Sequence, residues 1–286
     1  MPTAEANPPI VVGVDGSDAA LVALDWAAAE AAAAGWPLRL VNAYEETPLI
    51  PVMVAMTARE AAERILREAR ARLESGGFGD LSISMVTHHG FPRWVLLREA
   101  KGARALVVGR GGAGRLTELV LGSTSLACAT HATVPVVVVP EGWRPGSHGQ
   151  RIITLGVDGS PRCEAAIEFA FAAAARWQAR IVAVAALHLP EPVADLDVSE
   201  DARAHTAGML ADQLSPWRAK FAGMDVTEAV AAGHPAAVIA DHSADADLVV
   251  IGGRGHGVVT GMLLGSVARA VLHHVDRPIA VVHQPE

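Results

Sequence analysis

Residues 13–17 read Gly-Val-Asp-Gly-Ser, and residues 156–160 repeat the same five residues 143 positions later. The offset is half of the 286-residue length, and further matched pairs keep it along the whole chain. Those pairs are Gly90 and Gly233, Pro92 and Pro235, Gly109 and Gly252, Gly122-Ser123 and Gly265-Ser266, His131 and His274, and Pro135 and Pro278. A single offset that relates so many positions indicates a tandem duplication.

Small and turn-forming residues cluster where the two copies meet. Gly142, Pro145, Gly146, Ser147 and Gly149 all lie in one short stretch, which is typical of a linker. We therefore predict one domain over residues 1–142 and a second domain over residues 150–286.

Short apolar runs alternate with helical patterns in each copy. The run at residues 10–14 is nearly continuous, as expected for a parallel strand that is buried on both faces. Strands are predicted at residues 10–14, 38–43, 81–86, 106–108 and 135–139, and again at 152–157, 181–186, 226–231, 248–251 and 279–282. Five strands alternating with four helices predict an α/β fold with a doubly wound, Rossmann-like parallel sheet in each half. The second helix of the second half is expected to break or bend at Gly208 and Pro216.

The composition argues against several classes of function. The net charge is −8 and no concentrated basic stripe is present, so binding to nucleic acid is not expected. No uncharged apolar run approaches the roughly 18 residues of a spanning helix, and the first nine residues do not read as a secretory signal. We expect a soluble, cytoplasmic protein with no membrane span, in which Cys128 and Cys163 are unlinked thiols. No metal site is predicted, because the paired histidines have no further ligand at suitable spacing.

The most informative pattern follows the fourth predicted strand of each copy. Each copy carries a glycine, two residues, a second glycine, nine residues and then Gly-Ser. The positions are Gly109, Gly112, Gly122 and Ser123 in the first copy, and Gly252, Gly255, Gly265 and Ser266 in the second. Bare backbone amides in such a loop, together with the N-terminus of the next helix, form a site for phosphate groups. The alternative is that the glycines only shape turns and the serine only caps a helix.

Asp15 and Asp158 end the first strand of each copy, at the centre of the edge where doubly wound sheets bind ligands. A carboxylate there can meet a sugar hydroxyl or a bound Mg²⁺. Asp-Gly-Ser is equally a good turn and helix cap, and the residues alone do not decide between the two roles.

Other nucleotide and catalytic motifs are missing from the sequence. No P-loop lysine pattern occurs. The formal Gly-x-Gly-x-x-Gly match at residues 109–114 follows the wrong strand and is not repeated in the second copy. No nucleophile or positioned base is recognisable, so we expect no enzymatic activity beyond slow hydrolysis.

These residues resemble the universal stress protein family, in its tandem actinobacterial form. The repeated Gly-Val-Asp-Gly-Ser, the double-glycine pattern and the endings Pro-Val-Val-Val and Pro-Ile-Ala-Val carry the resemblance, which covers nearly the whole chain. The resemblance implies an adenine-nucleotide α-hydrolase-like fold with strand order 3-2-1-4-5. It also implies one ATP, with its Mg²⁺, in each half.

The resemblance further assigns roles to individual positions. Asp15 and Asp158 would face the nucleoside, and backbone groups at Ala43 and Ala186 would contact the adenine edge. The two double-glycine patterns would hold the ribose and the phosphates. The implied function is a nucleotide-dependent regulatory module in stress adaptation and growth control, acting as a homodimer on an unidentified protein partner. A weak ATPase and an interaction protein that binds no nucleotide are the alternatives.

Overall fold

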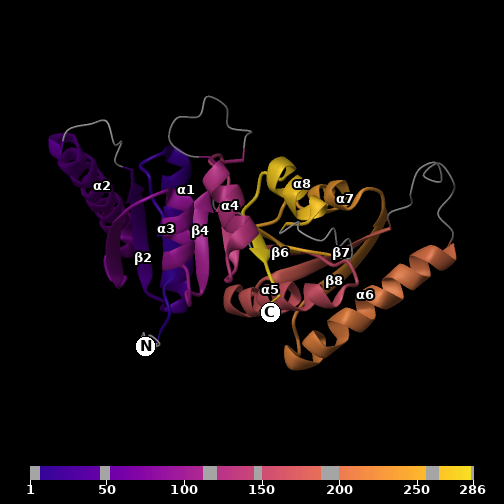
Figure 1. Ribbon diagram of the computed structural model, residues 1–286. Helices are drawn as coiled ribbons and strands as arrows, with labels where there is room; N and C mark the ends of the chain where they lie inside the picture. Colours follow the sequence, from indigo (N-terminus) through magenta and orange to yellow (C-terminus); the bar gives the residue numbers. More distant parts are fainter. Residues whose placement is uncertain are drawn as a thin grey trace. The chain divides into compact units, whose positions relative to one another are not determined.

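The computed structural model describes residues 7–45, 52–111, 121–144, 150–187, 200–255 and 264–284, with the side chains of 52–57 left out. The chain divides into two compact units, Met1–Arg144 and Pro145–Glu286. Figure 1 shows a parallel sheet with its helices in each unit.

Unit 1 alternates strands and helices as the sequence predicts. Its elements are β1 (Ile10–Gly13), α1 (Asp18–Ala34), β2 (Leu38–Tyr44), α2 (Val52–Leu73) with the π-helical turn η1 (Glu74–Phe78), β3 (Ile83–His89), α3 (Pro92–Glu99), β4 (Ala105–Gly109), α4 (Ser123–His131) and β5 (Val136–Val139). The strands pair in parallel in the order β3-β2-β1-β4-β5, which confirms the predicted order.

Unit 2 repeats this topology. Its elements are β6 (Ile152–Gly156), the 3₁₀ turn η2 (Pro161–Cys163), α5 (Glu164–Trp177), β7 (Arg180–Leu187), α6 (Glu200–Lys220), β8 (Val226–Ala232), α7 (Pro235–Asp241), β9 (Leu248–Gly252), α8 (Ser266–His274) and β10 (Ile279–Val282). The parallel order is β8-β7-β6-β9-β10, so β6 takes the central place that β1 has in unit 1.

The core of each unit lies around its central strands. Val11 and Val12 of β1 are fully buried, and so are Leu106 and Val107 of the neighbouring β4. Burial of both faces explains why these strands read as continuous apolar runs. Connections from the central strand run in both directions along the sheet, and the loops at the carboxyl ends of β1 and β4 therefore meet at a point where strand order reverses.

One of the two outcomes expected for the second helix of unit 2, a break, does not occur. α6 is a single helix from Glu200 to Lys220 and does not end at Gly208 or at Pro216. Pro216 lies in the last two turns and is exposed, so solvent can satisfy the carbonyl group that loses its partner there.

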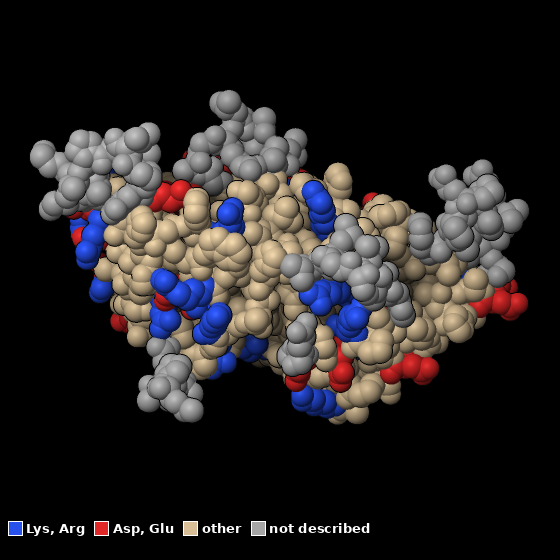
Figure 2. Space-filling model, in the orientation of Figure 1, with Lys and Arg blue, Asp and Glu red and all other residues tan. Residues whose placement is uncertain are grey.

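The face shown in Figure 2 has no single basic stripe. Its Lys and Arg side chains form separate groups, and several of these groups have Asp or Glu side chains next to them. Ion pairs join some of the charged side chains of the chain, as between Arg72 and Asp25 at 2.6 Å and between Arg218 and Glu228 at 2.8 Å. No helix among the described residues is both long and apolar enough to cross a membrane.

The two cysteines are buried free thiols, as predicted. Burial raises the pKa of Cys128 and of Cys163 to about 12, from an ordinary value of 9.0. Because the folded state holds these protons more tightly than the unfolded state, their contribution to stability is complete below pH 9 and is lost as the pH rises toward 12.

We expect the urea concentration at the midpoint of unfolding to be lower at pH 10 than at pH 8. The difference should be smaller in the double variant Cys128→Ala, Cys163→Ala. An equal fall in both proteins would contradict the burial of the thiols.

Candidate functional site

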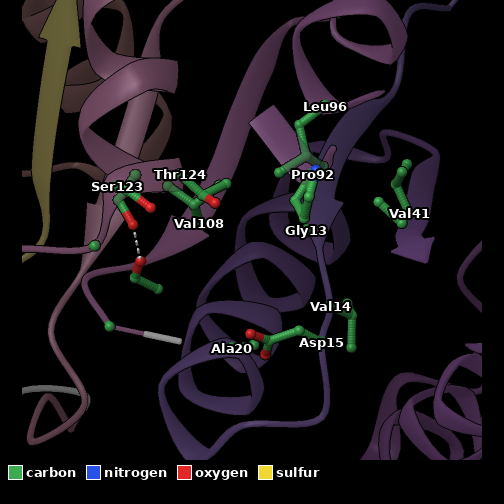
Figure 3. Close-up of a pocket in the computed structure, with 15 residues that line it drawn as sticks. Gly13, Val14, Asp15, Ala20, Val41, Pro92, Leu96, Val108, Ser123 and Thr124 are labelled. Carbon is green, nitrogen blue, oxygen red and sulfur yellow. Dashed lines mark hydrogen bonds between the residues drawn. The ribbon is translucent and has the colours of Figure 1, made fainter. Parts of the chain in front are cut away.

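A cavity of about 320 Å³ opens at the carboxyl edge of the unit 1 sheet (Figure 3). Its described lining comes from β1, β2 and β4, from the loops after β1 and β4, from α3, and from the first turns of α1 and α4. The lining residues are Gly13, Val14, Asp15, Ala20, Val41, Ala43, Pro92, Leu96, Val108, Gly109, Gly111, Gly122, Ser123, Thr124 and Ser125.

The cavity brings together Asp15, Ala43, Gly109, Gly122 and Ser123, which are five of the predicted site residues of unit 1. The sixth, Gly112, lies outside the described residues. In Figure 3, Ser123 and Thr124 lie on one side of the view and Val41 on the other, with Asp15 below and between them. The ends of β2 and α4 therefore bound opposite sides of one cavity, as an elongated ligand requires.

The N-terminus of α4 is held against the end of β4 by hydrogen bonds. Gly122 N–H donates to the Arg110 carbonyl at 2.7 Å, and the Ser125 hydroxyl donates to the Gly109 carbonyl at 2.6 Å. Gly122 is the cap residue and no side chain caps the helix, so the alternative in which Ser123 caps α4 is wrong. The first backbone N–H groups of a helix have no partner within it, and here they adjoin the cavity.

Gly109 is required by packing. A Cβ at this position would lie 2.6 Å from the backbone C and O atoms of Ala19 in α1, a distance that real Cβ atoms essentially never show. Gly122 is less constrained, with the Ser125 Oγ at 3.1 Å and the Arg110 carbonyl at 3.2 Å from a Cβ. The glycine pattern after β4 therefore combines a close helix–strand approach at Gly109 with access to bare backbone at the cavity.

Asp15 lines the cavity and also builds the turn after β1. Its Oδ1 accepts hydrogen bonds from the Ser17 backbone N–H at 3.0 Å and the Ser17 hydroxyl at 2.6 Å. The Ser17 hydroxyl in turn accepts from Ala20 N–H and caps α1. The predicted turn role is thus present, and the exposed carboxylate also borders the cavity.

Sequence reasoning missed the apolar wall of the cavity. Pro92 and Leu96 come from α3, Val41 comes from the middle of β2, and Val108 comes from the end of β4. Leu96 lies so close to Gly13 that a Cβ there would be 2.9 Å from the Leu96 Cδ1. The only signal in the sequence was a glycine at the end of a buried strand, which often marks the close approach of another group.

Unit 2 builds the corresponding edge with the same backbone connections. Gly265 N–H donates to the Gly253 carbonyl at 2.8 Å, and α8 begins at Ser266 with Gly265 as its cap and no side-chain cap. Asp158 accepts from the backbone N–H and the hydroxyl of Ser160, at 2.9 and 2.7 Å.

The remaining predicted residues of unit 2 occupy strand ends and the loop after β9. Ala186 lies near the end of β7, and Gly252 is the last residue of β9. Gly255, in the loop after β9, lies close to Asp158 in space. A Cβ on Gly255 would be 2.3 Å from the Asp158 Oδ2. The loop after β9 therefore reaches the turn after β6, and the two segments can act on one ligand.

Comparisons with known proteins give a consistent result. The sequence pattern of the universal stress protein family matches residues 7–140 and 150–283. A universal stress protein of Mycolicibacterium smegmatis is 32% identical over 291 residues, with 96% of each chain covered. One from Mycobacterium tuberculosis is 31% identical over 293 residues, again covering 96% of each chain. The crystal structure of a universal stress protein from Archaeoglobus fulgidus has a TM-score of 0.75 at 18% identity, covering 96% of this chain and 98% of that one, and bears on the fold alone.

Proposed function

Because this chain belongs to the universal stress protein family, with two tandem domains of that kind, we propose that it is an ATP-binding regulatory module with one nucleotide site in each unit. The observation that carries the proposal is the unit 1 cavity. The N-terminus of α4, which has no side-chain cap, lies on one side of this cavity, and β2 lies on the other.

The lining suggests how a nucleotide would lie. The adenine would pack at the end of β2 beside Val41 and Ala43, with backbone groups there meeting its polar edge. The ribose would lie over the turn after β1, where Asp15 offers a carboxylate to its hydroxyls. The triphosphate would reach the backbone amides of Ser123 and Thr124 at the start of α4, where the helix dipole favours negative charge. Mg²⁺ would enter as the counter-ion of the phosphates.

We propose regulation by occupancy, with ATP hydrolysis slow at most. Asp15 is the single ionisable side chain in the described lining, and one of its oxygens already accepts two hydrogen bonds from Ser17. A general base must lie within reach of the water that attacks the terminal phosphate, and the pose proposed above places Asp15 at the ribose instead. Bound nucleotide would instead fix the loops after the strands and so alter the surface offered to a protein partner or to a second copy of the chain.

The proposal is tested by the ligand that the protein carries and by its response to added nucleotide. We expect denaturation of the purified chain to release adenine nucleotide that mass spectrometry identifies. We also expect Mg-ATP at 100 times its Kd to stabilise a site by about 2.7 kcal/mol, seen as a clear rise in melting temperature. If no adenine nucleotide is released and saturating Mg-ATP leaves the melting temperature unchanged, the proposed function is wrong.

A further inference from the structure

The two nucleotide sites differ in side-chain charge at matched positions. The 143-residue offset pairs Ala19 with Arg162, Gly111 with Arg254 and Pro140 with His283. Each difference gives unit 2 a side chain that is or can become cationic where unit 1 has none.

The part of the unit 1 cavity that the structure describes offers little positive charge to a ligand. The described lining of its cavity contains no Lys, Arg or His. Arg110, which lies in the loop after β4, is only 3% exposed and is not part of that lining. Among the described residues, phosphate groups in unit 1 would therefore meet backbone amides and hydroxyl groups.

Unit 2 places a guanidinium group beside the corresponding loop. Arg162 belongs to η2, directly after the turn that Asp158 forms, and its Nη1 donates to the Gly255 carbonyl at 3.4 Å. Arg162 is exposed, and Gly255 is its only hydrogen-bond partner among the residues that the structure describes. The long contact to Gly255 leaves the other N–H groups of the guanidinium available to a ligand that lies along this loop.

The loop after β9 is shaped to lie close to ionisable side chains. A Cβ on Gly253 would lie 2.2 Å from the His283 ring, and a Cβ on Gly255 would lie 2.3 Å from the Asp158 Oδ2. Glycine at both positions therefore lets the backbone come close to His283 at Gly253 and to the Asp158 carboxylate at Gly255. A polyphosphate on this loop would come near the Asp158 carboxylate, and a cation beside it would offset that repulsion.

We propose that Arg162 is the specificity-determining residue of unit 2, and that it makes this site select nucleoside triphosphates over monophosphates. The inference rests on the proposed nucleotide-binding function and concerns the same site. A guanidinium group forms strong, charge-assisted hydrogen bonds with phosphate, and it gains most where several phosphate oxygens are within reach. AMP, whose one phosphate adjoins the ribose, would gain less from a side chain that lies along the loop.

The test uses full-length chains in which one site is disabled. Ser123→Glu places a carboxylate at the exposed first residue of α4 and leaves unit 2 for study. In that background, calorimetric titrations with Mg-ATP and with AMP are compared for Arg162, Arg162→Ala and Arg162→Lys. Arg203→Ala is the matched control, because it removes the same charge from an exposed position on α6.

We expect Arg162→Ala to weaken Mg-ATP binding by about tenfold or more while AMP binding changes by less than about twofold. Arg162→Lys should retain part of the preference, and Arg203→Ala should change neither affinity. Equal losses for both ligands, or no loss for either, would overturn the role of Arg162 while leaving nucleotide binding in place. If the unaltered chain binds neither nucleotide, the proposed function fails, and this inference fails with it.

Discussion

Replacing Gly265 with glutamate is expected to abolish ATP binding in unit 2 while the chain stays folded. Gly265 caps α8, and a Cβ there would meet its nearest neighbour, the Gly253 carbonyl, at 3.4 Å, which is an ordinary contact. The added carboxylate would occupy the N-terminus of α8, where the proposal places the phosphates. Because like charges brought together cost several kcal/mol, affinity at this site should fall about a hundredfold or more. Calorimetric titration with Mg-ATP should change from two sites per chain to one.

Gly265→Ala is the matched control. It adds the Cβ without the charge, so it should keep both sites near their original affinity. Two full-strength sites in Gly265→Glu would show that the phosphates do not bind at α8. A far-UV circular dichroism spectrum and a melting curve close to those of the unaltered chain would show that the loss reflects the site and not the fold.

Substitution of Gly109 by alanine is expected to destabilise unit 1 strongly. The new Cβ would lie 2.6 Å from the backbone C and O atoms of Ala19 and 3.0 Å from its Cβ, so α1 must shift away from β4. Overpacking of this kind costs about 1 to 3 kcal/mol, and contact with backbone places this case at the upper end. Urea unfolding followed by circular dichroism should show the loss, and the shift of α1 should also move the edge of the cavity.

The matched position in unit 2 provides the control for Gly109. A Cβ on Gly252 would meet the Arg254 carbonyl at 3.3 Å and the Arg162 carbonyl of η2 at 4.0 Å. A loop carbonyl can adjust by a few tenths of an ångström, so Gly252→Ala should cost about 1 kcal/mol or less. Equal destabilisation by the two substitutions would contradict the close approach of α1 to β4 in unit 1.

Much of the fold could be predicted because the repeat and the buried strands leave strong patterns. The central strands are buried on both faces, so their apolar runs identified them and the duplication gave each strand a second copy. β3 shows where the pattern fails, since it was predicted at residues 81–86 and extends from Ile83 to His89. It lies at the edge of the unit 1 sheet and its last residues are polar, so no apolar run marks its end.

The site was predictable where it depends on backbone. Glycines after β4 and β9 and the aspartates after β1 and β6 stand at strand ends, and parallel topology brings those ends to one edge. Side chains that arrive from other elements were not predictable. Leu96 reaches the cavity because α3 crosses the sheet, and Arg162 reaches Gly255 across 93 residues of sequence. Such contacts depend on helix placement, which local sequence patterns do not determine.

The central claim is that backbone amides at the start of α4 and α8 hold the phosphates of ATP. A crystal structure of the full chain grown in saturating Mg-ATP tests it most directly. The account predicts phosphate oxygens within hydrogen-bond distance of the backbone N–H groups of Ser123 and Thr124 in unit 1 and of Ser266 in unit 2. Density for the nucleotide elsewhere, or none at either helix N-terminus, would contradict it.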